Sequence, residues 1–139
     1  MDLPKTLAAA LALNRAAFGL NYLVRPAEAR KSWIGPVAKI PATQVIVRSQ
    51  GARDVALGAG ALRALARGDE RELRAWVSGQ TLSDLADLLA TWNARRKLPK
   101  RQARLALAVA GVSTLVGAAA AAGLSPRERS EAPSAPQSA

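Results

Sequence analysis

The sequence predicts an all-α protein, a four-helix transmembrane bundle with a polar, charge-paired interior. The first observation is the composition: alanine fills 32 of 139 positions, and half of all residues are apolar. The second is a run of twenty residues, 105–124, without an ionisable side chain. At about 1.5 Å per residue this run spans about 30 Å, the thickness of a hydrocarbon core. The third is a set of three weaker apolar stretches before this run. Their internal cations and acids are matched in number.

The first two helices are expected at residues 5–24 and 44–66. Pro26 cannot continue the first helix, because it lacks the backbone N–H that the helical ladder requires. Thr43 is a good N-cap for the second helix, and Gly68 is a typical residue for its C-terminal end.

The last two helices are expected at residues 73–92 and 104–123. Asp69 and Glu72 have the spacing of a capping box in front of the third helix. Residues 1–124 therefore form one membrane domain. The tail, 125–139, contains three prolines and no large apolar residue, so we expect it to be disordered.

The composition also excludes several kinds of chemistry. The chain has no cysteine and no histidine, which removes disulfides, thiol chemistry, histidine bases and nearly all zinc sites. We therefore expect no cofactor and no metal. The mean hydropathy of +0.03 is low for a multi-pass membrane protein and is the main observation against this interpretation.

The positive charges predict an orientation in the membrane. Ten Lys and Arg residues lie in the first and third connections, and six lie on the opposite side. Because cytoplasmic loops are enriched in Lys and Arg, both connections should be cytoplasmic and both termini external. Arginine outnumbers lysine 15 to 5, as in alanine-rich bacterial proteins, so the expected location is a bacterial plasma membrane. The third connection, which should contact anionic lipid headgroups, contains Arg95, Arg96, Lys97, Lys100, Arg101 and Arg104.

Polar residues inside the expected spans predict an intramembrane network. Charged groups in hydrocarbon have to face the bundle interior and find partners. The third span presents a polar stripe at spacings of four, three and four residues, and the first two spans supply cations. Three internal cations (Arg15, Arg53, Arg63) match three acids (Asp54, Asp84, Asp87). The expected network is Asn14, Arg15, Arg53, Asp54, Arg63, Gln80, Asp84, Asp87 and Thr91.

Three interpretations of this network remain open. It can be a structural clamp that sets the register of the helices, or a pathway for a ligand or proton. The third interpretation is a catalytic acid pair, Asp84 and Asp87. No nucleophile or histidine accompanies this pair, so we expect no catalytic residue and no enzyme.

Small residues recur every four positions on two of the expected helices. In a membrane such residues let helix backbones approach closely, which favours helix pairing. The packing positions expected from this pattern are Ala52, Ala56, Gly60 and Ala64 on the second helix, and Ser113 and Gly117 on the fourth.

The run from Arg48 to Gly58, RSQGARDVALG, followed by a span with acids at Asp84 and Asp87, resembles an uncharacterised family. That domain-of-unknown-function family contains small four-helix integral membrane proteins of bacteria and fungi. Its layout is distantly similar to that of DoxX-like proteins. The resemblance covers about residues 7–124 and implies a membrane location and four spans, but no activity.

Two classes of function follow. The first is an accessory or interaction subunit, associated with a larger membrane complex or with itself. The alternative is a minimal transporter that moves a proton or small solute along the Asp/Arg network. Nucleic acid is not an expected partner, because the basic segment 95–101 lacks an aromatic platform for bases in a chain with one Tyr and one Phe.

Overall fold

The computed structural model describes residues 2–124. Within that range every regular element is helical and no strand occurs, which confirms the all-α class. The predicted tail, 125–139, lies outside the described residues. The elements are α1 (Leu3–Val24), α2 (Pro26–Ile34), the 3₁₀ helix η1 (Gly35–Lys39), α3 (Pro41–Arg67), α4 (Glu70–Ala94) and α5 (Lys100–Gly123).

Local sequence signals set most of the helix ends. Asp69 caps α4, because its carboxylate accepts a hydrogen bond from the Glu72 backbone N–H at 2.8 Å. Gly68 ends α3 in the left-handed conformation, with φ of 69°. The expected cap at Thr43 is wrong. The N-cap is Ile40 and the helix starts at Pro41, three residues earlier than expected, because proline fits the first turn, where no N–H is needed.

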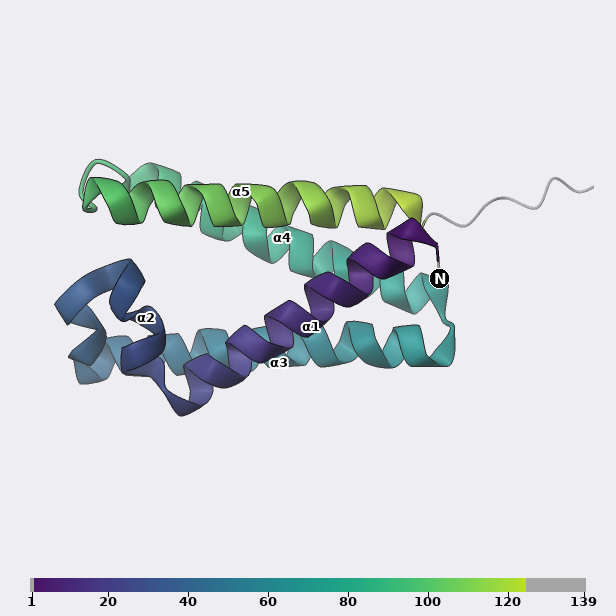
Figure 1. The fold of residues 1–139 in the computed structure, drawn as a ribbon, viewed down its shortest axis with the longest axis horizontal. Coiled ribbons are helices and arrows are strands. Elements are labelled where there is room, and N and C mark those ends of the chain that lie inside the picture. The colour runs from purple at the N-terminus through teal and green to yellow at the C-terminus, as the bar shows by residue number, and fades with distance from the viewer. Residues whose placement is uncertain (1, 125–139) are drawn as a thin grey trace, which may run out of the picture.

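Four long helices form two antiparallel pairs, α1 with α3 and α4 with α5, and α3 also packs on α4 (Figure 1). The start of α1, the α3–α4 turn and the end of α5 lie at one end of the molecule. There all four helices meet in a core of mostly small residues. From this end α1 and α5 diverge towards α2. The core consists of Ala8, Ala12, Ala61, Ala64, Leu73, Val77, Ala120 and Leu124.

Close contact between α1 and α3 depends on glycine. A Cβ atom added to Gly51 would lie 2.7 Å from the Gly19 carbonyl oxygen, and one added to Gly58 would lie 2.7 Å from the Ala12 carbonyl oxygen. Real Cβ contacts are not this short, so the two backbones approach closely only because these positions have no side chain. Neither Gly51 nor Gly58 is among the packing positions expected from the four-residue repeat of small residues.

The packing stripe expected on the second helix needs a correction. Ala52 and Ala56 are exposed, whereas Ala64 is buried and Gly60 lies against the Trp76 ring. Four residues turn a helix by 400°, so a strict four-residue stripe drifts by about 40° per step. Over twelve residues the stripe leaves the contact face. On α5, Gly117 is buried against Thr81, as expected for a packing position.

Large apolar side chains lie mainly on the outside of the bundle, and in residues 2–124 more than half of the buried apolar residues are alanines. By length and composition, two helices in the described residues could cross a membrane, α1 and α5. The other two expected spans, in α3 and α4, contain more charged residues. The most exposed large apolar residues include Leu3, Val24, Val45, Ile46, Leu82, Val112 and Leu115.

Candidate functional site: a polar cleft beside paired charges

The site is centred on Arg15, near the middle of α1. Its Nη1 atom donates to Asp54 Oδ1 on α3 at 2.8 Å, and its Nη2 atom forms an ion pair with Asp84 on α4. The side chains of Arg15, Asp54 and Asp84 are only 11%, 9% and 13% exposed. One guanidinium group therefore joins three helices through one buried and one nearly buried carboxylate.

A second arginine extends the cluster. Arg53 Nη2 donates to Asp87 Oδ2 on α4 at 3.2 Å and lies 3.4 Å from Asp54 Oδ1. Asp54 is thus shared by both arginines. These five residues (Arg15, Arg53, Asp54, Asp84 and Asp87) are called the polar cluster below.

Helix periodicity and close packing explain this arrangement. Asp84 and Asp87 are three residues apart on α4, so their side chains share a face. The glycine contacts between α1 and α3 draw the two backbones together next to Arg15. Its long side chain can therefore reach Asp54 on α3 and Asp84 on α4 at the same time.

Arg63, which the sequence analysis placed in the network, lies elsewhere. Its Nη2 atom donates to Glu72 Oε1 at 2.6 Å, and its side chain is 57% exposed. Nine residues separate Arg63 from Asp54, a rotation of 900°, which places the two on opposite faces of α3. The expected balance of three cations and three acids is therefore wrong, because two arginines face three aspartates.

The other predicted network residues separate into two groups. Asn14 and Thr91 line the cleft, and the Thr91 hydroxyl donates to the Asp87 carbonyl at 2.7 Å. Gln80 is buried away from the cleft, where its Nε2 atom donates to the Leu57 carbonyl at 3.0 Å. Gln80 thus joins α4 to α3 and does not line the cleft.

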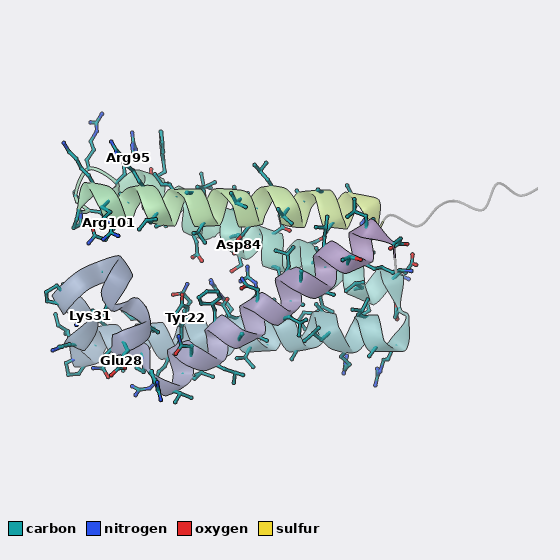
Figure 2. The ribbon with its side chains drawn as sticks, viewed as in Figure 1. Tyr22, Glu28, Lys31, Asp84, Arg95 and Arg101 are labelled. Atoms are coloured by element: carbon teal, nitrogen blue, oxygen red, sulfur yellow. The ribbon has the colours of Figure 1, made fainter. Side chains whose placement is uncertain are left out.

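A cavity of about 330 Å³ lies beside the polar cluster. In Figure 2, Asp84 on α4 and Tyr22 on α1 extend into the space between their helices. All four long helices contribute to its wall, which combines charged, amide, hydroxyl, aromatic and small apolar side chains. The lining residues are Leu11, Asn14, Arg15, Phe18, Tyr22, Gln50, Asp54, Asp84, Asp87, Ala90, Thr91, Ala106, Val109, Ala110 and Ser113.

The aromatic wall of this cleft was not among the site residues expected from the sequence. Phe18 and Tyr22 are the chain's one phenylalanine and one tyrosine, and their ring centroids lie 6.3 Å apart. They follow Arg15 by three and seven residues, a helical spacing that places all three side chains on one face. That spacing was the one sequence signal for an aromatic wall. It identifies the wall only when α1 is known to face α4 and α5.

The arrangement is suited to binding through charge. In residues 2–124 no group of three or more His, Cys, Asp or Glu side chains could hold a metal ion. The acids are each paired with a guanidinium, and the cavity gives a small molecule access to the Asp84 and Asp87 side of the cluster.

A basic surface lies at the opposite end from the N-terminus. Lys31 on α2 and Arg95 and Arg101 near the α4–α5 connection project there in Figure 2. The Arg95 guanidinium stacks over the Trp92 ring at 3.8 Å from the centroid, a cation–π contact. The remaining residues of the predicted headgroup surface, Arg96, Lys97, Lys100 and Arg104, are exposed.

The family described as "Domain of unknown function (DUF4267)" matches residues 12–124. The chain belongs to this family. The region matched to DUF4267 contains the whole polar cluster and every residue that lines the cleft except Leu11. No curated protein and no solved structure matches the chain.

Proposed function

We propose that this chain is a four-span integral protein of a bacterial plasma membrane that binds a small solute in its polar cleft and moves it across the bilayer. The single observation that carries this proposal is the cleft beside the polar cluster, which is lined by all four long helices. A paired charge network next to a cavity inside a membrane bundle is a typical arrangement for a solute or ion path.

The distribution of apolar residues supports the membrane location. Only 22% of the most apolar 18-residue window of α1 is buried, and 11% of that of α5. A core helix of a water-soluble protein would be mostly buried. Large apolar side chains outside and small ones inside are the arrangement expected when lipid surrounds the bundle.

The polar cluster lets α3 and α4 serve as the remaining two spans. Asp54 on α3 and Asp84 on α4 are paired with Arg15, and Asp87 is paired with Arg53. Ionisable groups that face inward and are paired are tolerated within a bilayer. The charges that the polar cluster contributes to these two helices are therefore compatible with a span.

We place the basic surface in the cytoplasm, against anionic headgroups, and both termini outside. Arg95 and Lys31 lie at the same end of the molecule, so the first and third connections share one side of the membrane. Cytoplasmic sides are rich in Lys and Arg. Reporter fusions after Arg96 and after Ala139 test this orientation. An active cytoplasmic reporter at Ala139 would contradict it.

Transport is tested in proteoliposomes containing the purified protein. The panel of solutes is ethylammonium, guanidinium, acetate, urea and glycerol, with uptake followed by light scattering after an osmotic step. The parent protein should accelerate uptake of at least one of them over empty vesicles. Vesicles no more permeable than protein-free vesicles to every solute and to protons would refute the proposal.

A matched pair of variants shows whether the solute uses the cleft. Ala90 is exposed and lines the cavity, so Ala90→Phe should fill the cleft without disturbing the core. Ala86 is exposed on the same helix and does not line the cavity. Uptake should stop in Ala90→Phe and continue in Ala86→Phe. Equal uptake by both variants would mean that the solute takes another route.

An accessory subunit is the second candidate function, and one observation favours it. Three exposed apolar residues of α5, which do not line the cleft, follow one helix face and could contact a partner helix: Leu105, Val112 and Leu115. Purification in mild detergent tests this function. A larger protein recovered in fixed stoichiometry, and lost when these three positions carry polar residues, would support it.

A further inference from the structure

The polar cluster carries one more negative charge than positive charge. Its cations are Arg15 and Arg53, and its acids are Asp54, Asp84 and Asp87. An unbalanced charge within a membrane bundle is unfavourable, because it lacks the water that would solvate it. One positively charged group bound beside the cluster would balance these charges.

Asp87 is the carboxylate best placed to meet that charge. Asp54 accepts from both arginines, and Asp84 is paired with Arg15 in a nearly buried position. Asp87 is contacted by Arg53 at 3.2 Å, its side chain is 43% exposed, and it lines the cleft. A molecule in the cleft can therefore reach the Asp87 carboxylate without breaking the buried pairs.

The opposite wall of the cleft favours an organic cation. Phe18 and Tyr22 line it from α1, and aromatic ring faces attract cationic groups. Small apolar side chains, Ala90 and Ala106 among them, complete the wall and suit a carbon skeleton. A volume of about 330 Å³ is at the small end of the range for organic ligands.

We infer that the solute is a small monovalent organic cation, with an ammonium or guanidinium group against Asp87 and an apolar body against Phe18 and Tyr22. This inference rests on the proposed function, because it names the class of solute that the same cleft takes. The net negative charge of the cluster repels anions. A bare metal ion would find fewer than three acidic ligands grouped around it.

Titration calorimetry on the purified protein in mild detergent tests the inference. The probe is tetramethylammonium chloride, with sodium chloride used to keep the ionic strength constant. The parent should bind one equivalent with a saturable isotherm. Asp87→Asn removes the charge at the cleft and should weaken binding at least tenfold. Phe18→Leu removes an aromatic face from an exposed position and should weaken binding about threefold.

Glu28→Gln is the matched control, because it removes one negative charge from an exposed position on α2, apart from Asp84 in Figure 2. Its affinity for tetramethylammonium should stay within twofold of the parent. Three results would each overturn the inference. The parent binds no tetramethylammonium saturably, Asp87→Asn and Glu28→Gln bind it with equal affinity, or potassium ions occupy the site as tightly as tetramethylammonium does.

The result is distinct from failure of the proposed function. If acetate or glycerol enters proteoliposomes, uptake stops in Ala90→Phe, and tetramethylammonium does not bind, transport through the cleft stands and the cationic class is wrong. If tetramethylammonium binds with the expected dependence on Asp87 while no solute crosses the vesicles, the cationic site stands and transport is wrong.

Discussion

Removal of the Asp84 carboxylate should destabilise the bundle, and by less than removal of its arginine partner. Breaking a buried ion pair by deleting one side costs about 3–5 kcal/mol, because the other charge stays buried and unpaired. After Asp84→Ala, Arg15 keeps Asp54 at 2.8 Å. We therefore expect a loss at the lower end of that range, about 3 kcal/mol.

Arg15→Met has the larger expected effect. It leaves Asp84 without a guanidinium contact and leaves Asp54 with Arg53 at 3.4 Å as its remaining partner. Both carboxylates are nearly buried, so the loss should approach about 5 kcal/mol. Adding Asp84→Leu to Arg15→Met should recover a large part of it, because the stranded carboxylate is then removed.

The assay is reversible unfolding of the purified protein in mixed micelles, in a single detergent system for all variants. Asp87→Ala is the matched control, since it removes an aspartate from the same helix face. Its pair with Arg53 is about 40% exposed on both sides, so the loss should be below about 1 kcal/mol. An Asp84→Ala protein as stable as the parent, or less stable than Arg15→Met, would contradict this ranking.

Two further predictions concern packing and acidity. Gly51→Ala should cost about 1–3 kcal/mol, because its Cβ would meet the α1 backbone. In Gly79→Ala the added Cβ would lie at an ordinary contact distance of 3.7 Å, so this variant should stabilise α4 by up to about 1 kcal/mol. A thermal midpoint of Gly51→Ala above that of Gly79→Ala would contradict the packing argument. The hydrogen bond from Arg63, followed by the one from the Trp76 indole, holds the pKa of Glu72 below its usual range. A carboxyl pKa lowered by folding contributes stability that is present above the unfolded pKa and lost as the pH falls. At pH 7 the parent should therefore have a higher melting temperature than Glu72→Gln, and the two melting temperatures should converge below about pH 4. A difference that stays constant over this pH range would exclude stabilisation by the ionised Glu72 carboxylate.

Elements that depend on neighbours in the chain could be predicted from the sequence. The capping aspartate Asp69 and the terminal Gly68 act within one turn of helix, so their residue types were sufficient. The long apolar run of α5 and the presence of acids within α4 were likewise visible without a fold. The start of α3 at Pro41 could not be separated from Thr43, because both residues favour a helix start.

The cleft depended on contacts between distant parts of the chain. The alanine content determined that the helices could pack closely, and the sequence placed Arg15, Asp54 and Asp84 near the centres of three helices. Their pairing required close contact of α1 and α3 at Gly19 and Gly51. It also required the rotation of α3 about its axis that places Arg63 away from the three aspartates. Helical phase and interhelical distance arise from packing summed over whole helices. No local pattern contains that sum, so only the tertiary structure decided that two arginines face three aspartates beside a cavity.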